Sequence, residues 1–229
     1  MDKKSNLLKR VPLYVLGMYL MDTGIAMTIH ARIGIAPISS LTRVMTVVQP
    51  ALTQGTYAIL LNLLMFLLAF LILPKDFKVT NFLQLIPAFI SGAFLDINLF
   101  LFRSLNPELY AVRMVLFLFG CCVVALGLFL MIETNVMLMP TDAIVSVIKK
   151  KTGKEWGSIK TGMDIIMVLT SATIGLVFTG KIHFIREGTL INAIIIGQLI
   201  RLYTRLFGAK KPAVPVAPAE SESQTQVIS

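Results

Sequence analysis

Six apolar segments, each close to the length of a membrane-spanning helix, dominate this sequence of 229 residues. They cover residues 11–29, 56–73, 82–102, 112–132, 163–179 and 189–207. A helix needs about 20 predominantly apolar residues to cross the hydrocarbon of a bilayer, and it satisfies its own backbone hydrogen bonds there. The chain is 56% hydrophobic and 14% charged, whereas about 25% of the residues of soluble domains are charged. We therefore predict an all-α, polytopic integral membrane protein with six main spans.

Two shorter apolar segments, residues 37–48 and 140–148, each begin with a proline. Proline is favoured in the first turn of a helix, where its missing N–H group is not needed. Both segments are too short to span the hydrocarbon, and both are interrupted by polar residues such as Arg43 and Asp142. We predict re-entrant or half-span helices here. If both segments cross instead, the chain has eight spans, four in each half.

The order of glycine, proline and polar residues in the first half recurs in the second half. Gly24 and Pro37 precede Gly127 and Pro140, respectively, by the same number of residues. With shifts of one or two residues, the same register pairs Asn62 with Asp164, Ala88 with Ala193, and Gly92 with Gly197. Such self-similarity indicates an internal repeat. Three spans per half predict a 3+3 inverted repeat, whereas the eight-span alternative makes the two halves parallel.

Charge placement indicates the cellular location. The formal net charge is +9, but the Lys and Arg residues lie between and beside the apolar segments and form no single basic stripe. We therefore expect no nucleic-acid partner. Under the positive-inside rule, this placement predicts a multi-pass protein of the bacterial cytoplasmic (inner) membrane with both termini in the cytoplasm.

Composition along the chain predicts four regions. These are a cytoplasmic N-terminus (1–10), two membrane halves (11–103 and 111–208), and a C-terminal tail (209–229). The tail contains spaced prolines and alanines followed by Ser, Glu, Gln and Thr, so it has little apolar area to bury. We expect this tail to be disordered and cytoplasmic.

The second half also carries motifs that identify a family. They are Pro140-Thr141-Asp142, Thr152-Gly153, Gly157, and Gly188-Thr189-Leu190-Ile191-Asn192-Ala193 followed by Ile196-Gly197. In these motifs the chain resembles the YczE/YyaS/YitT group of bacterial membrane proteins, and the resemblance covers nearly all of the membrane region. It implies a multi-span inner-membrane protein, and it brings no catalytic signature.

Ionisable residues inside apolar segments are costly in lipid, so they are the first candidates for a functional site. Asp142 and its repeat partner Ser39 lie two residues after the prolines. In transporters, the free N–H groups at such helix N-termini often bind ligands. The alternative is that Thr141 or Asp142 simply caps the helix.

Further polar residues lie within the predicted spans. Asp164 and its repeat partner Asn62 could bind a cation or an amine in a central cavity, or could lie hydrated near the interface. Asp22, followed by Thr23, lies deep in the first span and could carry a coupling proton.

Two pairs of equivalent positions suggest structural roles. Asp96 and Arg201 occupy matching places in the last span of each half. An ion pair between them near the pseudo-two-fold axis would offset the burial of both charges; alternatively, Arg201 extends to the cytoplasmic interface. Gly92 and Gly197 are predicted to let helices pack closely, because small residues allow close approach in lipid.

The sequence features bear on three functional classes: a transporter, a membrane scaffold or accessory protein, and an enzyme. Inverted repeats with short proline-led helices and polar residues near the membrane midplane are typical of transporters, here for a small solute or ion. A membrane scaffold or accessory protein for a partner enzyme or complex is the alternative. We do not expect an enzyme, because no serine elbow, P-loop or paired-histidine motif is present. We also expect no metal and no cofactor. The expected partner is the lipid bilayer, and the protein could form a homodimer.

Overall fold

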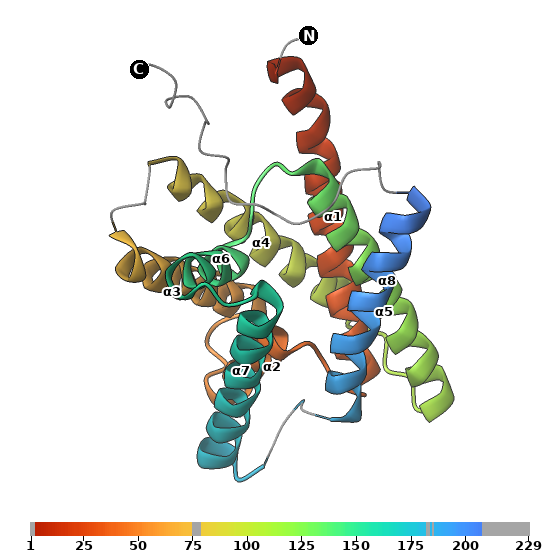
Figure 1. The fold of residues 1–229 in the computed structure, drawn as a ribbon. Helices are drawn as coiled ribbons and strands as arrows, with labels where there is room; N and C mark the ends of the chain where they lie inside the picture. Colours follow the sequence, from red (N-terminus) through yellow and green to blue (C-terminus); the bar gives the residue numbers. More distant parts are fainter. Residues whose placement is uncertain (1–2, 75–78, 182–183, 185, 208–229) are drawn as a thin grey trace, which may run out of the picture.

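The computed structural model describes residues 3–74, 79–181, 184 and 186–207. These residues form eight α-helices and contain no β-strand (Figure 1). The helices are α1 (Lys3–Ala31), α2 (Pro37–Val48), α3 (Gln54–Ile72), α4 (Leu85–Leu101), α5 (Tyr110–Thr134), α6 (Pro140–Thr152), α7 (Trp156–Thr179) and α8 (Glu187–Phe207), with a 3-10 helix η2 (Val79–Gln84) before α4. The predicted tail, 209–229, lies outside the described residues, and α1 already begins within the predicted N-terminal region.

Five of these helices are long and apolar enough to cross a membrane: α1, α3, α4, α5 and α7. The prediction of an all-α, polytopic membrane protein is therefore confirmed. The sixth predicted span corresponds to α8, which has a suitable length. Asn192, Gln198 and Arg201 interrupt its apolar sequence, and it is not among the five helices found within the described residues. The number of spans therefore stays a prediction.

The two short proline-led helices form as predicted. α2 begins at Pro37 and ends at Val48, and α6 begins at Pro140. α6 continues four residues beyond its predicted end, to Thr152, because three lysines in its last turn interact favourably with the helix dipole. Gly153 then ends the helix in a left-handed conformation, with φ of 69°.

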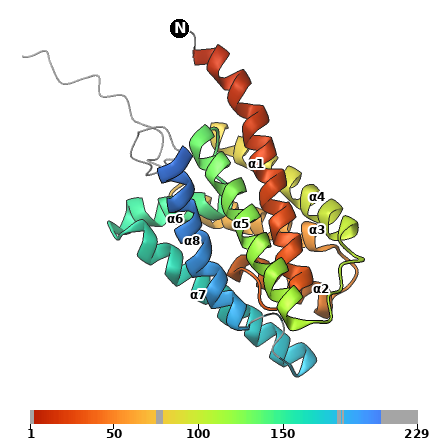
Figure 2. The same cartoon turned by 90° about the vertical axis from the view of Figure 1, so that its right-hand side faces the viewer.

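α1 and α5 run antiparallel and form the most extensive helix–helix contact among the described residues (Figures 1 and 2). Glycines allow their backbones to touch. A Cβ atom on Gly17 would lie 2.8 Å from the carbonyl oxygen of Gly127, and one on Gly24 would lie 2.6 Å from that of Gly120. The earlier glycine of α1 thus meets the later glycine of α5, and these close contacts determine how the two helices cross.

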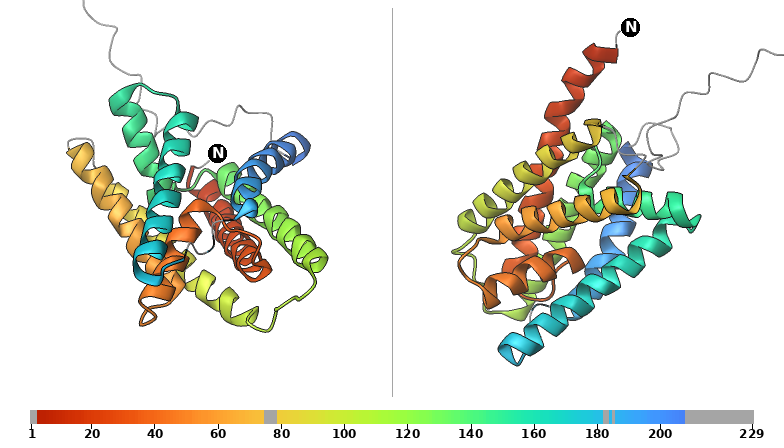
Figure 3. Two further views of the ribbon diagram at one scale, coloured as in Figure 1. Left: turned by 90° about the horizontal axis from the view of Figure 1, so that it is seen from below. Right: turned by 90° about the vertical axis from the view of Figure 1, so that its left-hand side faces the viewer.

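One further helix packs against each member of this pair. α4 packs against α1, and α8 packs against α5. On the other side of the molecule, α2 packs against α7, while α3 packs against both α6 and α4 (Figure 3). Each short helix therefore contacts the second long helix of the opposite half.

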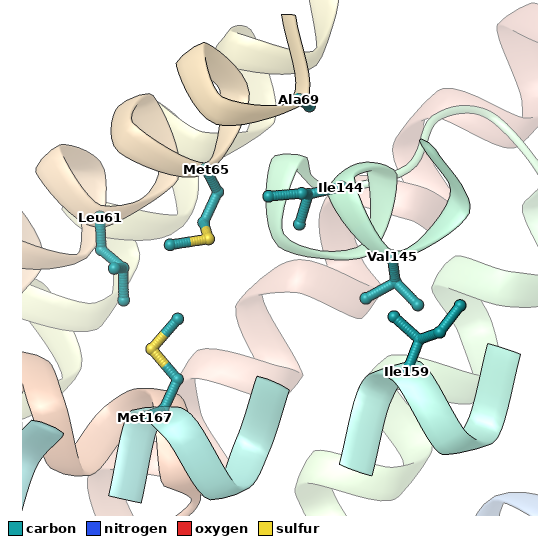
Figure 4. Packing of buried hydrophobic residues seen from close by; sticks show 7 residues of the cluster. All are labelled: Leu61, Met65, Ala69, Ile144, Val145, Ile159 and Met167. Atoms are coloured by element: carbon teal, nitrogen blue, oxygen red, sulfur yellow. The ribbon is translucent and has the colours of Figure 1, made fainter. Parts of the chain in front are cut away.

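An apolar cluster joins α3, α6 and α7 (Figure 4). Its buried members are Leu61, Met65, Ala69, Ile144, Val145, Ile159 and Met167. In contrast, many large apolar side chains on the outside of α7 are exposed, for example Leu169, Val177 and Phe178. Such an apolar exterior suits contact with lipid, which solvates these side chains as well as a protein core does. The cluster fixes the position of α6, whose first turn carries Asp142.

Candidate functional site

Two of the predicted site residues, Asp142 and Asp164, share one cationic partner. The Nζ atom of Lys160 lies 3.6 Å from Oδ1 of Asp142 and 3.7 Å from Oδ1 of Asp164. Asp142 comes from the first turn of α6, whereas Lys160 and Asp164 are one turn apart on α7. All three side chains are half-buried. We call Asp142, Lys160 and Asp164 the acid–lysine cluster; it combines two carboxylates with one ammonium group.

The N-terminus of α6 beside this cluster is not capped by a side chain. The N-cap residue, Met139, makes no side-chain hydrogen bond, and Thr141 is buried. Asp142 therefore binds Lys160 instead of serving as the cap. The hydroxyl group of Tyr14 is buried without a hydrogen-bond partner and interacts electrostatically with Asp142. Neither Lys160 nor Tyr14 is among the residues that the sequence singled out.

The repeat partners of the two acids lie apart from the cluster. Asn62 is buried on α3, where its Nδ2 atom donates to the carbonyl oxygen of Ala58 at 2.9 Å. Its Oδ1 atom is buried without a partner. Ser39 is buried on α2, and its carbonyl oxygen accepts a hydrogen bond from Thr42. Among the described residues, neither Asn62 nor Ser39 makes a hydrogen bond or ion pair with Lys160, so the two halves differ chemically at these positions.

Asp22 is the most deeply buried acidic residue of the described chain, with 1% of its surface exposed. Its Oδ1 atom accepts a hydrogen bond of 3.0 Å from the hydroxyl group of Ser91 on α4, and its Oδ2 atom is buried without a partner. The neighbouring Thr23 hydroxyl lies 2.7 Å from the carbonyl oxygen of Tyr19 and 3.0 Å from Oδ1 of Asn98. Polar contacts therefore link α1 to α4 inside an apolar region.

The predicted ion pair between Asp96 and Arg201 does not form among the described residues. The Oδ2 atom of Asp96 accepts a hydrogen bond of 2.5 Å from the Thr53 hydroxyl, and its Oδ1 atom accepts one of 2.7 Å from the backbone N–H of Gly55. Asp96 therefore satisfies the N-terminus of α3. Arg201 is exposed on α8, which packs against α5, whereas α4 packs against α1.

Replacing Asp96 with alanine is expected to lower the free energy of unfolding by about 1–3 kcal/mol, because the first turn of α3 loses its acceptor. Arg201→Gln serves as the matched control and is expected to leave stability unchanged. Thermal unfolding of the purified protein in detergent measures both effects. Recovery of stability in the charge-exchanged double variant, Asp96→Arg with Arg201→Asp, would contradict this assignment.

The two predicted packing glycines have different surroundings. A Cβ atom on Gly92 would lie 2.5 Å from Cγ1 of Ile59 and 2.8 Å from the carbonyl oxygen of Gly55, so Gly92 lets α4 lie against α3. A Cβ atom on Gly197 would have nothing within 4 Å. Within the described residues, no three His, Cys, Asp or Glu side chains lie close enough to hold a metal ion.

Comparison with known proteins places the chain in a family. The profile of DUF6198, a family of unknown function, matches residues 8–205. "Uncharacterized membrane protein YczE" of Bacillus subtilis (strain 168) is 23% identical over 199 residues, which cover 86% of each chain. "Uncharacterized protein YyaS" of the same organism is 25% identical over 193 residues, covering 83% of this chain and 90% of that one. No solved structure matches the chain. A profile match over most of the chain, two relatives aligned over most of their length, and several apolar helices together show that the chain belongs to the membrane protein family DUF6198, with YczE and YyaS among its relatives.

Proposed function

We propose that this protein is a transporter of a small solute or ion, working by alternating access between two inverted halves, and not an enzyme. The antiparallel crossing of α1 and α5, the first long helices of the two halves, is the observation that carries this proposal. In an inverted repeat, equivalent helices run in opposite directions, whereas in a parallel repeat they run in the same direction. The crossing therefore favours the 3+3 arrangement over the 4+4 arrangement.

Four further helix pairs support the same arrangement, whereas the extensive α3–α4 contact has no comparable counterpart between α7 and α8 among the described residues. Exchanging the two halves converts the pair α1–α4 into α5–α8, and the pair α2–α7 into α6–α3; all four pairs are in contact. The glycine contacts are exchanged in the same way, since Gly17–Gly127 becomes Gly120–Gly24. Two halves that pack through a few helix pairs can rock against each other, which is how many transporters expose a site to each side in turn.

The acid–lysine cluster is the candidate substrate site in this proposal. It has two acidic side chains and one basic side chain, and it lies beside the uncapped N-terminal turn of α6. A cationic group on a solute can join Lys160 beside the two carboxylates, so that each carboxylate and each cation has a partner of opposite charge. Asp22, with one buried carboxylate oxygen free of partners, is the candidate for a coupling proton.

Flux into proteoliposomes tests the proposal. Vesicles containing the purified protein are incubated with a defined mixture of amino acids, polyamines, Na⁺ and K⁺, and the trapped solutes are quantified by mass spectrometry and elemental analysis. We expect at least one component to accumulate above the level in protein-free vesicles. If none accumulates, and the protein instead copurifies with a stoichiometric partner after mild extraction, the accessory role replaces the transporter.

A further inference from the structure

Arg43, on the short helix α2, is a half-buried cation without a carboxylate partner. Its Nη1 atom donates to Oε1 of Gln54 at 3.3 Å, and its guanidinium carbon lies 5.7 Å from the centre of the Phe184 ring. Its Nε atom is buried and makes no hydrogen bond. Over the described part of the chain, no Asp or Glu lies within ion-pair distance of this guanidinium. A buried charge that lacks a counter-ion is strongly unfavourable.

Gln54 supplies a second unused donor at the same place. Only 2% of its surface is exposed, and its Nε2 atom is buried without a partner. Because its Oε1 atom already accepts from Arg43, the amide is held beside the guanidinium group. The Nε2 atom of His30, at the end of α1, is also buried without a partner, and His30 interacts electrostatically with Arg43 and Arg32. Unpaired nitrogen atoms from α1, α2 and α3 therefore occur in one positively charged region.

The side chains that contact the neighbouring end of α1 are basic as well, so they supply no negative charge to this region. Arg113 donates from Nε to the carbonyl oxygen of Ala31 at 2.8 Å and from Nη2 to that of Arg32 at 2.5 Å, and Arg186 also donates to Arg32 O, at 3.2 Å. These contacts satisfy the C-terminal carbonyl groups of α1 and add positive charge nearby. The missing element of the region is thus an acceptor that carries negative charge.

We propose that Arg43 and Gln54, with His30 beside them, form a binding site for an oxyanion, namely a carboxylate or phosphate group. A guanidinium group offers two parallel N–H donors, which match two oxygen atoms of such a group. The oxyanion belongs either to a free solute or to a phospholipid headgroup. Phe184 follows the C-terminal end of α7, whereas Lys160 lies in its first two turns. The oxyanion site is therefore separate from the acid–lysine cluster. The binding of an oxyanion to it can be measured without a transport assay.

Thermal unfolding of the full chain in dodecyl maltoside tests the site. The protein is titrated, at constant ionic strength, with inorganic phosphate, with acetate, and with short-chain phosphatidylglycerol. We expect at least one probe to raise Tm saturably by about 3 °C or more, since a ligand that binds only the folded state stabilises it. Gln54→Glu places a carboxylate beside Arg43, so we expect a higher Tm without probe and loss of the response. Arg103→Gln, at an exposed arginine outside the site, is the control and should keep the response.

The outcomes separate the two sources of the oxyanion. A response to phosphate or acetate identifies a solute site, and a response to phosphatidylglycerol alone identifies a lipid headgroup site. No response to any probe, or a response that persists in Gln54→Glu, would overturn the proposal. If Gln54→Glu does not yield folded protein, the neutral variant Arg43→Gln provides the same comparison and should also lose the response.

Discussion

Replacing Gly24 with alanine is expected to destabilise the protein by about 3 kcal/mol, because the closely packed backbones of α1 and α5 leave no room for a methyl group. A Cβ atom at this position would lie 2.6 Å from the carbonyl oxygen of Gly120 and 2.6 Å from the backbone nitrogen of Val124. Both are backbone atoms, so α1 and α5 must move apart to relieve the clash. Thermal or denaturant-induced unfolding in detergent measures the loss.

Gly162→Ala is the matched control for this experiment. Gly162 lies within α7, and a Cβ atom there would have nothing within 4 Å. Because alanine favours a helix over glycine by about 1 kcal/mol, we expect this variant to be as stable as the wild type or slightly more stable. Equal stability of Gly24→Ala and Gly162→Ala would show that α1 and α5 do not pack in the described register.

Neutralising both acids of the acid–lysine cluster, Asp142→Asn with Asp164→Asn, is expected to reduce flux at least tenfold, which corresponds to about 1.4 kcal/mol. The double variant leaves Lys160 without a counter-ion, so its Tm should also fall. Adding Lys160→Met removes this unpaired charge. The triple variant should therefore recover stability without recovering flux, as measured in the same proteoliposome assay.

This design separates a functional role of the acids from a structural one. If the acids only hold α6 against α7, the triple variant should regain both stability and flux, because its helices are again free of an unpaired charge. Such a recovery of flux would remove the acid–lysine cluster from the proposed mechanism. Asp96→Asn provides a control at an acid outside the cluster, and its flux per folded protein should match that of the wild type.

The sequence alone predicted the helices well, because their signals are local. Each apolar segment has the composition and length of a spanning helix, and Pro37 and Pro140 determine where the two short helices begin. The end of α6 was less predictable, since charged Lys149–Lys151 in its last turn resemble a loop by composition alone.

Hydrophobicity does not predict which helices pack against each other. The predicted ion pair between Asp96 and Arg201 was wrong for this reason. That pairing assumed that the last helices of the two halves lie together, but α1 and α5 pack together instead, with α4 against α1 and α8 against α5. The glycines provide a signal for this arrangement. Gly17 and Gly24 are two turns apart on α1, as are Gly120 and Gly127 on α5, and small residues at such spacing form one packing face.

The candidate site was only partly predictable for a related reason. Asp142 and Asp164 were identified because carboxylates are rare in apolar segments. Lys160, by contrast, looks like one more cytoplasmic loop charge until α6 and α7 are packed together. The contact of Asp22 with Ser91 joins helices that are distant in sequence, and the contact of Arg43 with Gln54 depends on how α2 packs against α3.

The central claim is that the two halves are inverted, and the sidedness of three loops tests it most directly. Single cysteines at Lys75, Asn106 and Lys151, introduced into a variant lacking Cys121 and Cys122, are labelled with a membrane-impermeant maleimide in intact cells and in inverted vesicles. The inverted arrangement predicts that positions 75 and 151 react from the cytoplasmic side and position 106 from the opposite side. Reaction of position 75 from outside, with 106 and 151 both cytoplasmic, would contradict it.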